Sequence, residues 1–266
     1  MSLTPPVSRT LDPVWFDAAK ARISSRRYTG EAIDPALLDQ LDQTCERLSA
    51  TPGAASAVLV REAPPEVFTG LVGSYGRVED SPSLVAFVGT DDAAHDVGYI
   101  GEAVILAATA LGLDTCWIAA SFDPERAGRL AALGEHERVH AITALGHATG
   151  KIGVSERLMR ASLRARSRLS LDVIAPGHES WPAWAQEAIS TLRLAPSGAN
   201  KQPWRLHMDG EALVVTEAPK VYWTAPLDFG IAMLHAELGA AHAGVSGTWV
   251  AGLDGEVARF VPGSAS

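Results

Sequence analysis

A ten-residue loop in the middle of the chain carries side chains suited to holding a ligand. Residues 195–204 read APSGANKQPW and follow an amphipathic segment. Prolines stiffen both ends of this loop, and Gly198 lets the backbone approach a ligand closely. Asn200 and Gln202 each offer two donors and an acceptor, which suits the polar edge of a heterocycle and nearby hydroxyls. The loop therefore predicts a site for a heterocyclic cofactor.

Two groups of arginines suggest an anion site in an otherwise acidic chain. The formal net charge is -9 at pH 7, yet arginines gather near the N-terminus and again in the middle. The members are Arg22, Arg26 and Arg27 in the first group and Arg157, Arg160, Arg164, Arg166 and Arg168 in the second. Arginine binds phosphate through paired, charge-assisted hydrogen bonds. Two solvated helix faces would give the same pattern, and the charges alone do not separate these readings.

Composition limits the class of protein. The chain has 266 residues, of which 47% are hydrophobic, enough for one large domain or two compact halves. Its negative charge argues against nucleic acid or an anionic membrane as the main partner. Only two cysteines are present, no apolar run reaches membrane-spanning length, and residues 1–15 lack the pattern of a signal peptide. These features predict a cytoplasmic protein with neither a nucleic-acid nor a membrane partner.

The chain contains an internal repeat. Residues 95–117 read HDVGYIGEAVILAATALGLDTCW, and residues 227–249 read LDFGIAMLHAELGAAHAGVSGTW. Both segments contain Asp-x-Gly, continue as an alanine-rich apolar helix, and end in Gly-x-x-x-x-Trp, in which Trp follows Gly by five residues. The same spacing separates Asp96 from Trp117 and Asp228 from Trp249. Several matches held in register predict two equivalent halves.

The match continues upstream of both segments. Each half begins with an arginine-rich entry and an amphipathic helix, which in the first half has apolar residues at Leu37, Leu38, Leu41 and Leu48. A loop and two strands follow, at 57–60 and 83–90 in the first half and at 205–208 and 211–218 in the second. This order predicts a duplicated α+β fold. We expect halves at 20–150 and 169–266, joined by an arginine-rich connector at 151–168.

The two halves are not equivalent in their loops. The first loop, TPGAAS at 51–56, lacks the Asn, Gln and Trp of the second. The second half ends soon after Trp249 and is expected to have no counterpart of residues 122–148. One of two related sites is therefore expected to be kept.

The chain resembles the nitroreductase family of FMN enzymes, over nearly its whole length after residue 20. Ordinary members are homodimers, in which one subunit supplies basic residues for the phosphate and the other a PSxxNxQPW loop. This sequence is similar to a fused type, the "putative TM nitroreductase" type, in which two halves of one chain mimic the dimer. The resemblance implies two mixed-sheet halves with flanking helices, packed as a pseudo-dimer that can work as a monomer.

The resemblance assigns the FMN phosphate to two basic motifs. The segment RISSR at 22–26 is similar to the family's early RxSxR motif, and RSR at 166–168 to a late basic triplet. Together they give the expected phosphate ligands Arg22, Ser24, Arg26, Arg166 and Arg168. Bonds of this charged kind contribute about 1.5–3 kcal/mol each.

The remaining cofactor contacts come from three segments. The segment WIAASFD at 117–123 resembles the turn whose backbone N–H groups face flavin N5 and O4, where the family often has Gly or Glu. Arg77 stands for a basic residue near the pyrimidine edge. Trp204 and Trp223 are the tryptophans whose motifs place them near the site. The expected ring ligands are Arg77, Ala119, Ala120, Pro196, Ser197, Gly198, Asn200 and Gln202.

The resemblance implies an FMN-dependent NAD(P)H oxidoreductase. Electrons from NADH or NADPH would pass through flavin N5 to a nitroaromatic, a quinone or a similar small acceptor. Such flavin-centred chemistry requires no catalytic acid or nucleophile from the protein. The alternative is a sensor or carrier that binds FMN or another small ligand, without turnover, on a degenerate nitroreductase fold.

Two other motifs compete with this reading. HERVH at 136–140 fits the H-E-x-x-H zinc pattern, but Gly134 ends the helix before it and residues 139–147 alternate like a strand. GHATGK at 146–151 is one residue short of a phosphate-binding loop. We therefore predict no metal site.

Overall fold

The computed structural model describes residues 10–50, 55–70, 77–150 and 167–263. The longer helices are α1 (Val14–Ala21), α2 (Pro35–Ser49), α3 (Ala94–Ala110), α4 (Pro124–Ala131), α7 (Ala183–Leu192) and α8 (Ala225–His242). The short helices are η1 (Pro65–Val67), α6 (Leu171–Ile174), η2 (His178–Ser180) and η3 (Gly198–Asn200). The strands are β1 (Ala55–Val60), β2 (Ser83–Gly89), β3 (Asp114–Ile118), β4 (Arg138–Gly146), β5 (Trp204–Asp209), β6 (Ala212–Glu217), β7 (Gly247–Ala251) and β8 (Glu256–Pro262).

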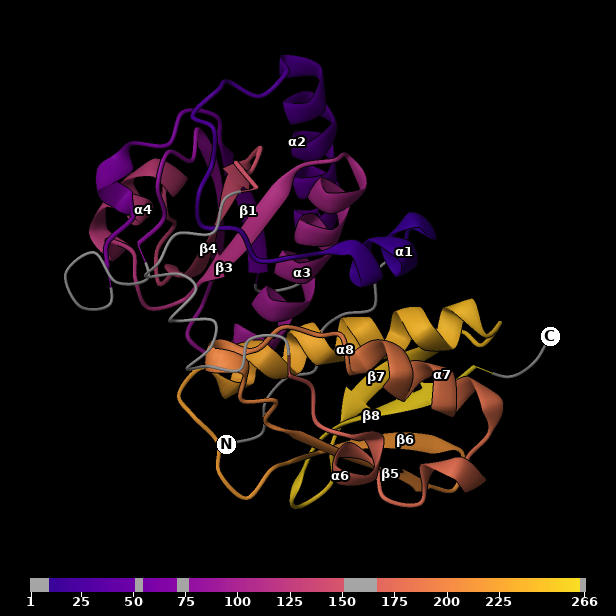
Figure 1. Cartoon of the computed structure of the whole chain (residues 1–266). Coiled ribbons are helices and arrows are strands. Elements are labelled where there is room, and N and C mark those ends of the chain that lie inside the picture. The colour runs from indigo at the N-terminus through magenta and orange to yellow at the C-terminus, as the bar shows by residue number, and fades with distance from the viewer. Residues whose placement is uncertain (1–9, 51–54, 71–76, 151–166, 264–266) are drawn as a thin grey trace.

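The strands form two four-stranded sheets with the same topology. The first has the order β1-β2-β4-β3 and the second the order β5-β6-β8-β7. All neighbouring strands in both sheets pair antiparallel. Isolated parallel bridges also join Ser24 to Thr115 of β3 and Arg27 to Glu79. Figure 1 shows α3 and α8 side by side between the two sheets. The expected α+β fold of two similar halves is confirmed.

The elements follow from the pattern of apolar residues. Asp34 caps α2 by accepting a hydrogen bond from the N–H of Ala36, and the buried Leu38, Leu41 and Leu48 form its inner face. The helices α3 and α8 are apolar on nearly all sides, and most of their residues are buried. A helix with this composition belongs inside a fold rather than on its surface. The main hydrophobic core accordingly runs through both halves.

The crossing of α3 and α8 shows that the repeated segments are equivalent elements. A Cβ atom placed on Gly98 would lie 2.1 Å from the carbonyl oxygen of Leu227. A Cβ atom placed on Gly230 would lie 1.9 Å from the carbonyl oxygen of His95. His95 and Leu227 each precede their own helix's glycine by the same three residues. The two contacts are therefore related by a pseudo-twofold axis between the halves.

The second half contains a strand that the sequence analysis missed. We expected no counterpart of residues 122–148 after Trp249, but β8 occupies the place of β4 and pairs with both β6 and β7. The connection hid this equivalence, because β7 leads to β8 through a short turn whereas the first half inserts α4 between β3 and β4. Within residues 167–263, α4 has no counterpart between β7 and β8. It covers a second, smaller core in the first half.

Two further expectations concern the connector between the halves and membrane-spanning helices. Residues 151–166, which include most of the expected connector and Arg166, lie outside the described residues. The boundaries at 151–168 therefore stay a prediction. Among the residues that the structure does describe, no helix has the length and hydropathy needed to cross a bilayer.

His95 is buried without a partner, and this predicts a pH effect. Its side chain is fully buried, neither ring nitrogen has a hydrogen-bond partner, and burial lowers the pKa of His95 to about 4. A folded-state pKa below the unfolded value of about 6.5 means that stability falls as the pH drops from 6.5 towards 4. His95→Leu copies the residue at the equivalent position, Leu227. We expect this change to raise the free energy of unfolding by about 1–2 kcal/mol at pH 7.5.

Urea unfolding at pH 7.5 and at pH 5 measures both expectations for His95→Leu. The variant should also lose less stability than the wild type between the two pH values. His207→Leu, at an exposed position on β5, is the control for a histidine outside the core. Equal pH dependence in wild type and His95→Leu would show that burial of this ring has no such cost.

Candidate functional site

A cavity of about 420 Å³ opens between the two halves. Its lining combines predicted residues that are far apart in the sequence. From the first half come Ser24, Arg26, Ala119 and Ala120, and from the second half come Pro196, Ser197 and Gly198. The RxSxR-like segment, the turn after β3 and the APSGANKQPW loop therefore meet at one place, as a site shared between two halves requires.

The APSGANKQPW loop is held in an unusual backbone conformation. Ala199, Asn200 and Gln202 have φ values of 48°, 56° and 49°, in the left-handed region that side chains other than glycine rarely adopt. The hydroxyl of Ser197 accepts a hydrogen bond from the N–H of Gln202 at 2.9 Å. Strain of this kind persists where the surroundings impose it, and it is typical of ligand sites.

Two predicted ligands in this loop face the protein instead of the cavity. The side chain of Gln202 is buried, and its Oε1 accepts a hydrogen bond from the N–H of Leu169 at 2.9 Å. Asn200 accepts a bond from Arg168 Nη1 at 2.6 Å and donates one to the carbonyl of Ser167 at 2.8 Å. Neither Asn200 nor Gln202 is among the residues that line the cavity. In this structure both amides fix the shape of the loop.

Asp228 holds the loop in place, although it was not among the residues predicted for the site. Its carboxylate lines the cavity and accepts hydrogen bonds from the N–H of Gly198 at 2.9 Å and from the hydroxyl of Thr224 at 3.3 Å. Burial raises the pKa of Asp228 to about 7, against the opposing effect of these two bonds. The sequence contained one indication of its importance, because Asp228 recurs in the repeat at the position equivalent to Asp96.

Beside Ser24 lies a group of arginines suited to an anion. Arg22 is almost fully buried, donates to the hydroxyl of Ser24 at 3.2 Å, and lies 3.7 Å from the carboxylate of Glu102. Its Nε has no hydrogen-bond partner. Burial, and then the positive charges of Arg22 and Arg193, lower the pKa of Arg168. Arg22 and Arg168 both lie near the single carboxylate of Glu102, and this leaves an excess of positive charge that a phosphate would neutralise.

Arg77 is not part of this arrangement. The residue is exposed and is not among those that line the cavity. Arg166 cannot be placed, because it lies outside the described residues. Of the two predicted tryptophans, Trp223 lines the cavity, whereas Trp204 is fully buried away from it.

Comparison with known proteins agrees with this geometry. Residues 15–240 match the model of a protein family described as "Putative TM nitroreductase". The chain belongs to this nitroreductase family. No curated protein matches it in sequence.

One solved structure has the same fold over nearly the whole chain, and two others resemble part of it. A "putative nitroreductase" from Thermotoga maritima superposes with a TM-score of 0.63 at 19% identity, covering 96% of this chain and 95% of that one. Nitroreductase A from Vibrio parahaemolyticus has a TM-score of 0.45 at 18% identity and covers 65% of this chain and 78% of its own. A nitroreductase with bound FMN from Bacteroides fragilis has a TM-score of 0.41 at 19% identity and covers 52% of this chain and 91% of its own.

In this nitroreductase-family chain, buried carboxylates link the cavity wall to the interface between the halves. Trp117 lines the cavity, and its Nε1 donates to Glu102 at 2.6 Å. The other carboxylate oxygen of Glu102 lies 2.9 Å from Nε2 of His235 on α8. Across the pseudo-twofold axis, Glu237 accepts bonds from Trp249 at 3.1 Å and from Tyr99 on α3 at 2.7 Å. Each central helix thus supplies one carboxylate that contacts both halves.

The zinc-like motif of this nitroreductase-family chain is divided between a turn and a strand. His136 is exposed and has a positive φ of 65°, whereas His140 lies on β4 with Nε2 2.8 Å from the carbonyl of Thr90. The expected strand is confirmed. The two imidazoles therefore belong to different local structures.

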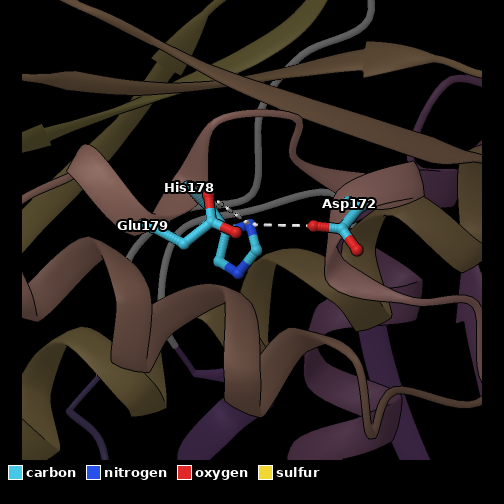
Figure 2. Close-up of side chains that lie close together, drawn as sticks. All are labelled: Asp172, His178 and Glu179. Carbon is cyan, nitrogen blue, oxygen red and sulfur yellow. Dashed lines mark ion pairs between the residues drawn. The ribbon is translucent and has the colours of Figure 1, made fainter.

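A different group of possible metal ligands lies on the surface. Figure 2 shows Asp172, His178 and Glu179, whose ligand atoms all lie within 4.8 Å of one another. Nδ1 of His178 is 3.9 Å from Asp172 and 3.7 Å from Glu179, too far for direct hydrogen bonds. Both carboxylates are largely exposed, and none of the three residues lines the cavity. The group, a partly buried imidazole beside two exposed carboxylates, is separate from the candidate site.

Proposed function

We propose that this protein is an FMN-dependent NAD(P)H oxidoreductase that reduces nitroaromatics, quinones or similar small acceptors. The observation that carries the proposal is the cavity between the halves, which brings Ser24 and Arg26 to the loop at Ser197 and Gly198. Membership of the nitroreductase family supports it.

The residues present fit the chemistry of FMN. Arg22, Ser24 and Arg26 would hold the phosphate: Ser24 and Arg26 line the cavity, and Arg22 lies behind them, where it donates to the Ser24 hydroxyl. The turn at Ala119 and Ala120 would present backbone N–H groups to the polar edge of the ring, opposite the loop. Bound FMN would supply hydride transfer at its N5 atom.

The protein's own part in such a reaction is to bind, orient and exclude water. The apolar wall of the cavity comes from both halves, with Trp117 from the first and Leu227 and Ile231 from the second. Asp228 fixes the loop in place by accepting a hydrogen bond from the N–H of Gly198. A fixed polar edge in an apolar cavity stabilises charge that develops on a bound ring.

Anaerobic absorbance titration of the purified protein tests this function. We expect a yellow protein whose flavin band is lost on adding NADPH or NADH and recovers when a quinone is added. A yellow protein that neither donor bleaches would instead indicate a binding protein without turnover. A protein that takes up no FMN would contradict both possibilities.

Removing the cavity-lining arginine should weaken cofactor binding. We expect Arg26→Ala to reduce FMN affinity by about 1.5–3 kcal/mol, which is roughly one to two decades in Kd. Equilibrium dialysis or fluorescence titration with FMN measures this change. Arg129→Ala is the matched control, because Arg129 is exposed on α4 and pairs with Glu125 along its own helix. Unchanged affinity in both Arg26→Ala and Arg22→Ala would overturn the phosphate assignment.

A single FMN should bind to each chain. The mirror position would depend on the first loop, whose sequence 51–56 has no equivalent of the Asn200 and Gln202 amides that fix the shape of the second loop. A loop without that shape would leave the polar edge of a bound ring unpaired. Burying the polar edge of the ring unpaired costs about 1–3 kcal/mol per group. Flavin extracted from protein saturated with FMN should therefore approach one equivalent, and a reproducible ratio of two would contradict the asymmetry.

We also infer an internal duplication and a chain that works as a monomer. The shared topology of the sheets and the reciprocal glycine contacts support the duplication. The second half supplies the loop that a partner subunit would otherwise provide. Sedimentation analysis showing that FMN binds only to a dimer would contradict the monomer.

A further inference from the structure

Three consecutive exposed hydrophobic side chains lie at the rim of the cavity. Val221, Tyr222 and Trp223 precede α8 and are 42%, 45% and 70% exposed. Tyr222 and Trp223 line the cavity as well. A cluster of exposed aromatic side chains beside a cavity is typical of a ligand-binding surface, because leaving them in water has a free-energy cost.

A positive charge lies against the same aromatic surface. Lys201 lines the cavity, and its ammonium group is 4.6 Å from the centre of the Tyr222 ring. Among the described residues, no carboxylate or hydrogen-bond acceptor pairs with this ammonium group. The contact holds the lysine at the rim through a cation–π interaction without neutralising its charge.

The other charged groups of the cavity are already engaged. Asp228 bonds to the N–H of Gly198 and the hydroxyl of Thr224, and burial brings its pKa to about 7. Arg26 is assigned to the cofactor phosphate under the proposed function. Lys201 is therefore the charge left for a second ligand at the mouth.

We propose that Lys201, Tyr222 and Trp223 form the acceptor subsite, and that it selects planar aromatic acceptors that carry a negative charge. The assignment of this subsite to the acceptor rests on the proposed function. The subsite itself is defined by its two aromatic rings and the ammonium group. The aromatic side chains supply a flat apolar surface, and the ammonium group supplies the preference for an anion.

Calorimetric titration with a matched pair of rings tests this subsite. The probes are 2-naphthoate and 2-naphthamide, which share one ring system, differ in charge, and are titrated into the flavin-loaded protein without an electron donor. We expect the carboxylate to bind about fivefold tighter at low salt, a preference of the size that an exposed ion pair gives. The preference should shrink as salt is added.

Three variants assign the effect to individual side chains. Lys201→Met should remove the preference for the carboxylate, and Lys201→Arg should keep it. Lys220→Met is the charge-matched control, since Lys220 is exposed on the same segment but does not line the cavity. Trp223→Ala should weaken both probes by roughly five- to tenfold, because each loses the same stacking surface.

The outcomes separate this inference from the proposed function. If the wild type binds 2-naphthoate and 2-naphthamide equally, and Lys201→Met does the same, the subsite is wrong. This holds even if NADPH bleaches the flavin. A Lys201-dependent preference in protein that takes up no FMN would keep the subsite and reject the proposed function. A third titration uses NADPH, which also combines aromatic rings with negative charge, carried by its phosphates. If Lys201→Met weakens only NADPH, the lysine serves the donor and the acceptor assignment is wrong.

Discussion

Gly230→Ala is expected to destabilise the protein by about 3 kcal/mol or more, because the added methyl group would collide with backbone rather than with a flexible side chain. The nearest atoms to the new Cβ are the carbonyl oxygen of His95 at 1.9 Å and the amide nitrogen of Tyr99 at 2.8 Å. Neither can move without shifting α3 against α8. Urea unfolding monitored by far-UV circular dichroism measures the loss.

The same substitution should also disturb the candidate site. Leu227 and Asp228 line the cavity from the first turn of α8, one turn before Gly230. Gly128→Ala is the matched control, since its Cβ would meet only the side chain of Leu133, at 3.0 Å. We expect that variant to stay within about 1 kcal/mol of wild type, because alanine also favours the helix. A Gly230→Ala protein as stable as Gly128→Ala would show that the two helices are not tightly packed.

Glu102→Ala is the second substitution with a large expected effect. The side chain of Glu102 is completely buried, and it accepts a hydrogen bond from Trp117 while lying close to His235 and Arg22. Its removal leaves the charge of Arg22 and the indole N–H of Trp117 without their buried partner. Loss of one member of a buried charged group typically costs about 3–5 kcal/mol. Thermal and urea unfolding should show a loss of this size.

Two further variants distinguish the network from a general sensitivity of the chain. Glu102→Gln keeps an oxygen for Trp117 but removes the negative charge, so its loss should be smaller than that of Glu102→Ala. Glu125→Ala removes an exposed carboxylate on α4 and should change stability by less than about 0.5 kcal/mol. If Glu102→Ala and Glu125→Ala were equally stable, the buried network would not contribute to folding.

The repeat and the residues that meet at the cavity were accessible from the sequence. Asp-x-Gly and Gly-x-x-x-x-Trp recur at fixed spacing because the same helix–strand unit must pack twice around one axis. The motif positions Ser24, Arg26, Ala119 and Ser197 then converge because the two halves face each other. Backbone placement of this kind follows from pattern and topology.

Side-chain direction was not accessible in the same way. Asn200 and Gln202 have the polarity of ligands, yet the left-handed backbone of the loop turns both amides towards residues 167–169. Lys201, between them, lines the cavity instead. Sequence pattern gives residue spacing, but positive φ values at neighbouring residues change which side chains point outward.

Covalent joining of the halves changes what a substitution can do at their interface. In a symmetric pair of identical subunits every change occurs twice, so a residue that improves one site alters its mirror image as well. Here the positions on either side of the crossing have diverged: His95 faces Gly230 where Leu227 faces Gly98. Each side of the axis is encoded separately. One of the two related sites can therefore become specialised for ligand contact while its mirror image becomes purely structural, which a symmetric dimer does not permit.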